Sequence, residues 1–215
     1  MISIEGQQKL LVAISEKLRK KVTVYAVGGT AMMLLGIKDA TLDIDLVFDN
    51  EKDRDEFKKA AKSIGYKEMD AVKVYGTKEN RPDMMTLGDE RFDMFLDKVI
   101  SFHFSKEMKK RAVKMLQFGD SLMLKVADPH DIILMKCATD RAKDRDDARK
   151  IANTKDIDWN IIIEEAKSQV KLGMKSAILD LGYFLEDLSE TMKVKIPKKV
   201  LDAIFDILKM QIVDE

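Results

Sequence analysis

The amino-acid sequence predicts an α/β (α+β) protein in which helices flank a mixed β-sheet and a helical region follows. Up to residue 127, short β-branched and aromatic runs alternate with amphipathic helical segments. From Asp128-Pro129 onward every segment has a helical pattern. Asp at the N-cap and Pro at the first helical position form a strong helix start. We therefore expect a sheet domain at 1–127 and a C-terminal helical domain at 128–215 packed on it.

The elements of the sheet domain follow from local patterns. Helices are expected where apolar residues recur on one face (4–20), where Ala, Met and Leu are frequent (30–35), and in a charged segment before Gly65 (51–64). Strands are expected in β-branched, aromatic or alternating runs, namely 22–27, 43–48, 71–76, 84–87, 91–96, 112–118 and 121–126. The last two should form a hairpin around Gly119-Asp120. Because helices join some successive strands and turns join others, the sheet should be mixed.

The C-terminal region is predicted to be helical throughout. Gly173 and Pro197 separate its segments. The expected helices lie near 129–141, 143–153, 158–170, 175–189 and 197–211. We expect them to pack on the sheet domain and to form a wall of a cleft beside it.

Composition narrows the class of protein. Of 215 residues, 46% are hydrophobic and 35% are charged, with 38 basic and 38 acidic side chains. This balance argues against a general nucleic-acid coat, which would need a net basic surface. The single cysteine, Cys137, excludes an intrachain disulfide framework and fits a reducing compartment. Without a membrane-length apolar run or signal peptide, a cytoplasmic protein that does not enter membranes is expected.

Gly28-Gly29 lies at the turn between the expected strand 22–27 and the expected helix 30–35. Without a Cβ, glycine lets phosphate oxygens approach the backbone N–H groups at the head of a helix. Thr30 would be the N-cap or the first helical residue, with its hydroxyl directed to the same place. A Gly-Gly pair alone is often only a structural turn, but here an acidic strand follows it.

Asp43 and Asp45 are separated by one apolar residue, Ile44. Residues i and i+2 of a strand point to the same face, so the two carboxylates would project together while Ile44 enters the core. Carboxylates this close repel each other unless a cation lies between them or one takes up a proton. Such oxygen-rich sites suit Mg²⁺ bound together with substrate phosphates. The other interpretation is a solvated strand edge.

This arrangement resembles the nucleotidyltransferase superfamily, whose members share a DNA polymerase beta-like catalytic core. Its signature is an apolar residue with Gly-Gly or Gly-Ser, then Asp-x-Asp on a strand and a third carboxylate on a later strand. Asp93 is the candidate for the third position, although Asp89, Glu90 and Asp97 lie nearby. The resemblance implies a nucleotidyltransferase-like mixed sheet and transfer of a nucleoside monophosphate from an NTP to an acceptor hydroxyl.

The resemblance also implies roles for individual residues. Asp43, Asp45 and Asp93 would be the catalytic metal ligands for two Mg²⁺ ions, with Asp93 also serving as the base. Gly28, Gly29 and Thr30 would hold the β- and γ-phosphates.

Within the superfamily, the chain is similar to small prokaryotic proteins related to the AbiEii toxins of toxin–antitoxin systems. The similarity rests on Thr41-Leu42-Asp43-Ile44-Asp45-Leu46 and on a later phrase with Lys136, Arg141, Lys143-Asp144 and Asp147. It implies RNA, tRNA or protein as the acceptor and a cognate antitoxin-like partner. Relatives often carry Arg two residues before the Thr, where this chain has Asp39 beside Lys38.

Several interpretations remain open at this level. Lys136, Arg141 and Lys143 are candidates for phosphate or acceptor contacts, with Asp144 and Asp147 orienting them. On one continuous helix, however, Lys136, Asp140, Lys143 and Asp147 would simply form a solvated stripe of ion pairs. His103 and His130 lack metal-ligand spacing and should make local hydrogen bonds. The alternative function is a catalytically reduced nucleotide-binding or regulatory module. The oligomeric state, the NTP and the acceptor are not predicted.

Overall fold

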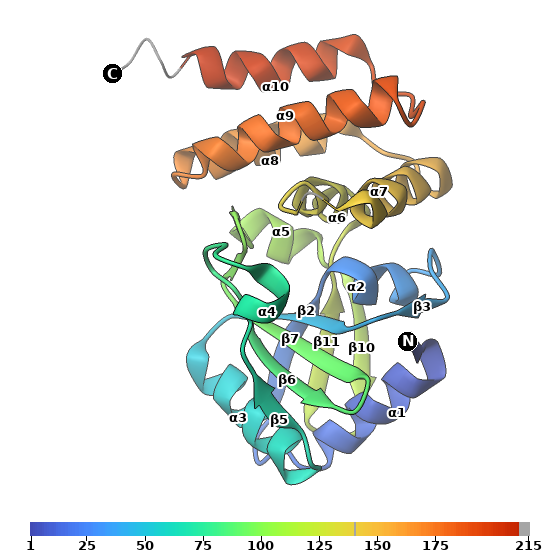
Figure 1. The fold of residues 1–215 in the computed structure, drawn as a ribbon, viewed down its shortest axis with the longest axis vertical. Coiled ribbons are helices and arrows are strands. Elements are labelled where there is room, and N and C mark those ends of the chain that lie inside the picture. The colour runs from blue at the N-terminus through green and yellow to red at the C-terminus, as the bar shows by residue number, and fades with distance from the viewer. Residues whose placement is uncertain (140, 211–215) are drawn as a thin grey trace.

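The computed structural model describes residues 1–139 and 141–210 and has a mixed β-sheet below a stack of helices (Figure 1). In the main sheet the strand order is β10-β11-β2-β4-β7-β6-β5, and β8 and β9 extend from β7. Its strands are β2 (Val22–Ala26), β4 (Ile44–Phe48), β5 (Lys67–Met69), β6 (Asp83–Leu87), β7 (Glu90–Leu96), β8 (Lys98–Val99), β9 (Phe102–His103), β10 (Lys114–Phe118) and β11 (Leu122–Val126). A separate two-stranded sheet pairs β1 (Ile2–Ser3) with β3 (Ala40–Thr41).

The pairing is both parallel and antiparallel, as predicted. Strand β4 pairs parallel with β7 and antiparallel with β2, and β2 pairs parallel with β11. The hairpin of β10 and β11 is antiparallel around Gly119, which has φ +52°. Strand β4 therefore lies in the middle of the sheet, where its side chains are held from both sides.

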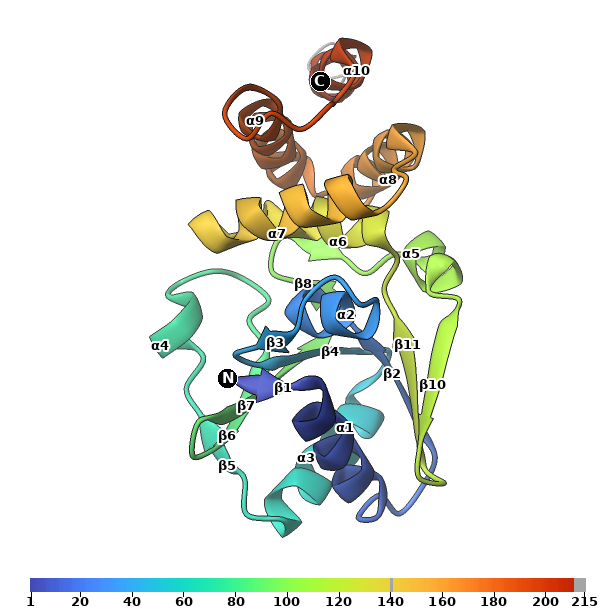
Figure 2. The same cartoon turned by 90° about the vertical axis from the view of Figure 1, so that its right-hand side faces the viewer.

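Helices cover the two faces of the sheet (Figure 2). Helices α1 (Ile4–Ser15) and α3 (Glu51–Ser63) contact each other and the strands on one face. The short helix α2 (Gly28–Leu34) contacts β4 and α6, and therefore lies between the sheet and the helical stack. Phe48, Phe57 and Phe92 pack edge to face beneath β4 and β7, which anchors both strands from below.

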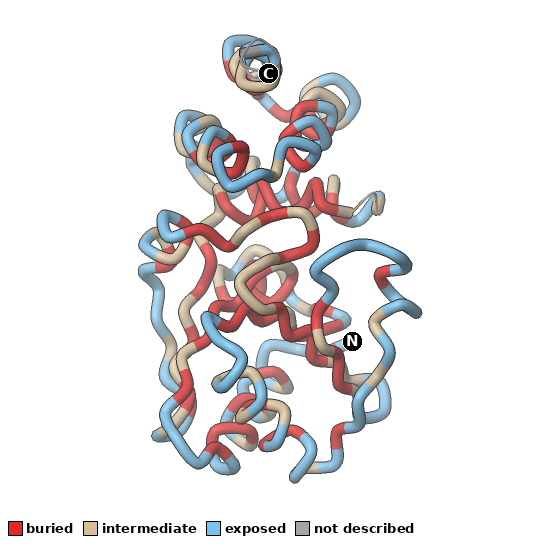
Figure 3. Tube along the Cα trace, turned by 90° about the vertical axis from the view of Figure 1, so that its left-hand side faces the viewer, coloured by how far each residue is buried: buried red, intermediate tan, exposed pale blue. Residues whose placement is uncertain are grey.

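The helical region has five helices within the described residues, each close to its predicted place. They are α6 (Pro129–Lys136), α7 (Ala142–Thr154), α8 (Trp159–Lys171), α9 (Lys175–Glu190) and α10 (Lys198–Met210). Asp128 is the N-cap of α6 and accepts a hydrogen bond from the backbone N–H of His130 at 3.0 Å, as the Asp-Pro pair indicated. Asp140 and position 211, the end of the last predicted helix, lie outside the described residues. Buried positions follow the strands and the inner faces of these helices (Figure 3).

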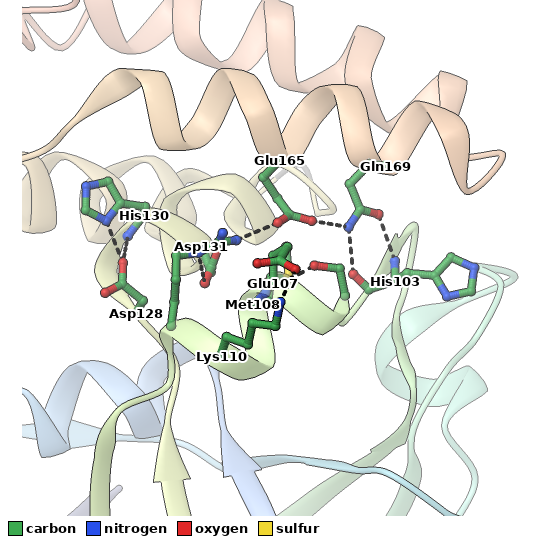
Figure 4. Close-up of polar contacts among 11 residues, drawn as sticks. His103, Glu107, Met108, Lys110, Asp128, His130, Asp131, Glu165 and Gln169 are labelled. Atoms are coloured by element: carbon green, nitrogen blue, oxygen red, sulfur yellow. Dashed lines mark hydrogen bonds and ion pairs between the residues drawn. The ribbon is translucent and has the colours of Figure 1, made fainter.

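A buried polar network joins α6 and α8 to the rest of the protein through α5 (Lys106–Arg111), which was not predicted (Figure 4). The Arg111 guanidinium donates to Asp131 at 2.7 Å and to Glu165 at 2.5 Å. Glu165 also accepts from the Gln169 amide at 2.9 Å. Gln169 in turn bonds both the backbone N–H and the carbonyl of His103. One guanidinium thus neutralises carboxylates from two helices of the C-terminal region.

The predicted strand at 71–76 is wrong. This segment contains a one-turn helix, α4 (Val72–Tyr75), with Val72 and Val74 exposed and Tyr75 buried. Asp70 initiates the turn by accepting a hydrogen bond from the Val72 N–H at 2.9 Å, and Gly76 ends it at φ +59°. The alternating valines favoured a strand, but local side-chain capping decides the conformation.

Other differences are smaller. Helix α1 ends at Ser15 rather than near residue 20, and strand β4 begins at Ile44, so Asp43 lies just before it. In the described part of the chain, no helix is both long enough and apolar enough to span a bilayer.

Candidate active site

Three carboxylates converge at the edge of β4 and β7 that faces the helical stack. Asp43 immediately precedes β4, Asp45 is the second residue of that strand, and Asp93 lies in β7. Asp45 and Asp93 are direct partners in the parallel register. One oxygen from each of the three carboxylates lies within 4.8 Å of the other two. Ile44 is fully buried, as expected for the residue between two aspartates on one face.

Thr30 in α2 fixes the backbone of the first two carboxylates. Its hydroxyl accepts a hydrogen bond from the Asp45 N–H at 2.8 Å and donates to the Asp43 carbonyl at 3.4 Å. Thr30 is fully buried, so these bonds form away from water. Thr41 in β3 supplements them by donating to the Asp43 carboxylate at 3.5 Å. The Gly-Gly-Thr turn is therefore attached directly to the acidic strand.

Gly28 and Gly29 bring this turn close to the carboxylates. Gly28 has φ +53°, and a Cβ built on it would lie 2.6 Å from Oδ2 of Asp45. A Cβ on Gly29 would collide with the Thr41 hydroxyl. The missing side chains thus permit the close approach of the turn to Asp45 and Thr41, which is the physical reason for glycine at both positions.

Arg91 and Tyr75 complete the surroundings of the acidic cluster, and neither was predicted. The Arg91 Nε donates to Asp93 Oδ1 at 2.8 Å, and its Nη2 donates to Asp93 Oδ2 at 3.1 Å and also to Asp43. The Tyr75 hydroxyl donates to Asp93 Oδ2 at 2.6 Å. Arg91 precedes Asp93 by two residues on one strand, so the i, i+2 rule could have identified it. Tyr75 gives no such signal because the alternating valines of its segment favour a strand.

Burial and mutual repulsion shape the ionisation of the cluster. Burial, followed by the charges of Asp43 and Asp93, raises the pKa of Asp45 well above its usual value. Burial also raises the pKa of Asp93, although the Arg91 guanidinium and the Tyr75 hydroxyl act in the opposite direction. Burial and the neighbouring carboxylates raise the pKa of Tyr75, which keeps its hydroxyl protonated as a donor. A group of carboxylates with these properties gains stability from a bound cation.

A cleft opens beside Asp45 between the sheet and the helical stack. It has an empty volume of about 490 Å³, including space open to solvent. Its lining includes the charged side chains of Lys136, Arg141 and Asp144. The remaining lining residues are Val27, Gly28, Asp45, Tyr75, Phe95, Val99, Ile100, Ile132, Met135, Ala138 and Thr139. The helical region thus forms one wall of the cleft.

The three basic residues proposed to contact phosphate or acceptor, Lys136, Arg141 and Lys143, lie in different environments. Lys136 is buried and donates to Asp144 at 2.8 Å and to Asp147 at 2.7 Å. Arg141 lines the cleft and donates to Asp144 at 2.7 Å. Lys143 is exposed on α7 and does not line the cleft. The carboxylates of Asp144 and Asp147 therefore orient Lys136 and Arg141.

Helix α6 ends at Lys136 and helix α7 begins at Ala142. The two segments are therefore not one continuous helix, and the stripe of ion pairs that such a helix would carry does not form. Lys38 precedes Asp39, the residue found where relatives often carry Arg. The Lys38 side chain forms an ion pair with Asp147 at 3.0 Å. Burial tends to lower the pKa of Lys136, but the charges of Asp144 and Asp147 outweigh it and raise that pKa. Lys136 is thus a charged group in the wall of the cleft.

The two histidines make local hydrogen bonds, as expected. His130 Nδ1 lies 2.5 Å from Asp128 Oδ1, and His103 Nδ1 lies 3.4 Å from Asp97 Oδ2. Cys137 is buried, and burial raises the pKa of its thiol well above the usual value. Neither the histidines nor the thiol contributes to the acidic cluster.

The acidic cluster fits a hard divalent cation. All its donors are carboxylate oxygens, close enough to share ions, and the Gly28 turn leaves room at Asp45. Mg²⁺ prefers oxygen ligands of this kind and commonly binds through one or two carboxylates plus substrate phosphates.

Two solved structures of ANT(2'')-Ia have a distant likeness to this chain. No curated protein matches the chain. The crystal structure of ANT(2'')-Ia in complex with adenylyl-2''-tobramycin is 15% identical, with a TM-score of 0.45, covering 84% of this chain and 97% of that one. The solution structure of the antibiotic-resistance factor ANT(2'')-Ia is also 15% identical, with a TM-score of 0.45 and coverage of 88% and 96%. Neither likeness is close enough to carry an argument about activity.

The family comparison is more extensive. Residues 3–180 match the model of a family described as "Nucleotidyltransferase of unknown function (DUF6036)". This match covers well over half of the chain and includes the Gly-Gly turn, all three carboxylates and the helices that line the cleft. The chain therefore belongs to the DUF6036 family of nucleotidyltransferases.

Proposed function

We propose that this protein is a metal-dependent nucleotidyltransferase that moves a nucleoside monophosphate from an NTP to an acceptor hydroxyl. The observation that carries the proposal is the convergence of Asp43, Asp45 and Asp93 beside a glycine turn and an open cleft. In the reaction, the acceptor oxygen forms a bond to the α-phosphorus, the bond from that phosphorus to the bridging oxygen breaks, and pyrophosphate leaves.

The three carboxylates would hold two Mg²⁺ ions. When bound, such ions polarise the phosphate and lower the pKa of the attacking hydroxyl. Asp43 and Asp45 would hold the nucleotide side of the site. Asp93 would face the acceptor and take up the proton of its hydroxyl, a role that fits the raised pKa of its carboxyl group.

The Gly28-Gly29 backbone would contact the β- and γ-phosphates, since the first N–H groups of a helix lack intrahelical partners. Thr30 would act mainly through its bonds to the backbone of Asp43 and Asp45. Lys136 uses two of its three donors on Asp144 and Asp147, which leaves one for the cleft. Arg141 would add a second cation for the phosphates. The exposed Lys143 fits a contact to the acceptor better than one to the nucleotide.

We further propose, from the resemblance to AbiEii-like toxins alone, that the acceptor is RNA, such as tRNA, or a protein side chain. The same resemblance supports a prokaryotic toxin–antitoxin role with an antitoxin-like partner. The domain division is proposed at 127/128, so that the sheet domain carries the carboxylates and the helical domain closes the cleft. A soluble cytoplasmic location fits this assignment.

A second candidate function is a catalytically reduced module that binds nucleotide without transferring it. One observation favours it: Arg91 and Tyr75 already occupy both oxygens of Asp93, the proposed base. A module of this kind would bind NTP but leave the acceptor hydroxyl unactivated.

One experiment separates the two functions. Each α-labelled NTP is incubated with Mg²⁺, total tRNA and cellular protein, with Asp43→Asn and Asp45→Asn run in parallel. Label transferred by the wild type and lost in both variants supports the enzyme and identifies the acceptor class. Mg²⁺-dependent nucleotide binding in calorimetry without any transfer supports the module. Absence of both binding and transfer contradicts the enzyme and favours a regulatory module that does not bind nucleotide.

A further inference from the structure

Arg91 occupies the acidic cluster in a way that the proposed reaction does not require. Its guanidinium lies against Asp43 and Asp93 at once, although these carboxylates come from different strands. The Arg91 side chain is only 20% exposed, so the ion pairs form in a largely desolvated place. Its bonds use both oxygens of Asp93 and one of Asp43, which are among the atoms available to a metal.

We propose that Arg91 is a positioning residue that serves as an internal counter-cation: it holds Asp43 and Asp93 together before metal binds and limits the affinity of the site for the metal. Three carboxylates in one buried cluster would otherwise repel each other. A planar guanidinium suits this task because its fork can bond two carboxylates simultaneously.

The geometry implies competition between Arg91 and a divalent ion. An ion held by Asp43 and Asp93 would compete with the guanidinium, because Arg91 bonds both oxygens of Asp93 and one oxygen of Asp43. Asp45 lines the cleft and offers the first point of contact to an ion entering from there. Metal binding therefore proceeds at the expense of the Arg91 ion pairs.

The Tyr75 hydroxyl favours the exchange of the Arg91 guanidinium for a metal ion. It donates to Asp93 Oδ2 independently of Arg91, so Asp93 keeps one fixed partner when the guanidinium withdraws. Tyr75 also packs edge to face on Phe95, which lies in β7 together with Asp93, and the ring centroids are 6.1 Å apart. The carboxylate thus remains oriented while its charge partner changes.

The test is metal affinity, and it rests on the metal binding assumed in the proposed function. Mg²⁺ dissociation constants are measured by calorimetry for the wild type, Arg91→Met, Arg91→Lys and the control Arg149→Met. Arg149 is a partly exposed arginine of α7 that pairs with Asp146 at 3.3 Å, so its replacement changes the net charge equally. Because a unit charge a few Å from the ion is removed, Arg91→Met should bind Mg²⁺ about tenfold more tightly or better. Arg91→Lys should lie in between, and Arg149→Met should match the wild type.

A purely structural clamp predicts the opposite sign. Weaker or unchanged Mg²⁺ affinity in a folded Arg91→Met protein would overturn the inference while leaving the proposed function intact. If the wild type binds no Mg²⁺ even in the presence of an NTP, both the inference and the metal-dependent function are contradicted.

A measurement on the wild type covers the case in which Arg91→Met does not fold. The Nε–H signal of Arg91 in ¹⁵N NMR, assigned with Arg91→Lys, reports its bond to Asp93. We expect this signal to shift as Mg²⁺ saturates the site. A signal that stays unchanged at saturation would show that Arg91 keeps its hydrogen bond to Asp93 when Mg²⁺ binds, and would overturn the inference.

Discussion

Asp45 and Asp93 lie side by side as register partners in the parallel pairing of β4 with β7. Their separation is therefore set by the backbone hydrogen bonds of a central sheet position rather than by flexible loops. Asp43, one residue before the strand, joins them through its contacts with Thr41 and Arg91. A site built on two paired strands is held in place before any ligand arrives.

Replacing Gly28 with Ala should weaken metal binding. The new Cβ would lie 2.6 Å from Oδ2 of Asp45 at a residue with φ +53°, so the carboxylate must move. We expect Mg²⁺ affinity to fall roughly tenfold and stability to fall by about 1–2 kcal/mol from the backbone strain. Calorimetry and urea unfolding measure the two effects.

Gly36→Ala is the matched control for this substitution. Gly36 also has a positive φ, +71°, but a Cβ there meets nothing within 4 Å. It should show the loss of stability without the loss of metal affinity. Equal Mg²⁺ affinity in both variants would mean that the Gly28 turn does not constrain Asp45.

Thr30→Val should destabilise the fold without adding volume. It removes the hydroxyl that accepts from the Asp45 N–H, and Thr30 is fully buried. An unpaired buried group costs about 1–3 kcal/mol, to be measured by urea unfolding. Thr30→Ser retains the hydroxyl and should recover most of the stability that Thr30→Val loses. A serine variant as unstable as Thr30→Val would contradict the role of the hydroxyl.

The stability conferred by Lys136 should depend on pH. Although burial opposes it, the charge of Lys136 helps to lower the pKa values of Asp144 and Asp147 below their ordinary 3.8. A carboxyl whose pKa is lowered by folding stabilises the protein above its unfolded value and loses this contribution as pH falls through the folded value. Lys136→Met should therefore be less stable than the wild type at pH 7, and the difference should shrink below about pH 4. A difference independent of pH would contradict this origin.

Arg111→Met should destabilise the junction between the sheet and the helical region. It leaves the buried carboxylates of Asp131 and Glu165 without their shared guanidinium (Figure 4). Breaking a buried ion pair costs on the order of 3 kcal/mol or more. Thermal unfolding of the metal-free protein measures the effect.

Lys110→Met provides the exposed comparison on the same helix. Lys110 pairs with Glu107 at 2.7 Å, but both side chains are more than half exposed. Such a pair contributes about 0–1 kcal/mol, so the melting temperature should hardly change. Equal losses in Arg111→Met and Lys110→Met would mean that the buried network does not hold the junction.

Much of the architecture could be predicted from sequence because periodicity and capping are local signals. The Asp128-Pro129 helix start, the Gly119 hairpin and the order of the C-terminal helices required only neighbouring residues. The proximity of Asp43 and Asp45 could be anticipated from their i, i+2 spacing, whereas Asp93 is assigned to the cluster only through the resemblance to nucleotidyltransferases.

Tertiary contacts explain what could not be predicted. The environment of Tyr75 depends on a one-turn helix that contacts Asp93 across 18 residues of sequence. The interpretation of Lys136 as part of a solvated stripe is wrong. Lys136 is buried, because the chain turns between α6 and α7 and brings Asp144 and Asp147 over it. Such contacts arise from packing between distant segments and produce no periodic pattern in the sequence.

The position of Arg91 on the same strand as Asp93 has a consequence for the evolution of the site. Because residues two apart on β7 share a face, a three-residue segment of one strand carries both the acid and its neutralising base. A duplication, circular permutation or grafting of this strand would transfer the pair as an electrically balanced unit. Because its net charge is zero, such a unit can pair and pack in a sheet without a bound cation.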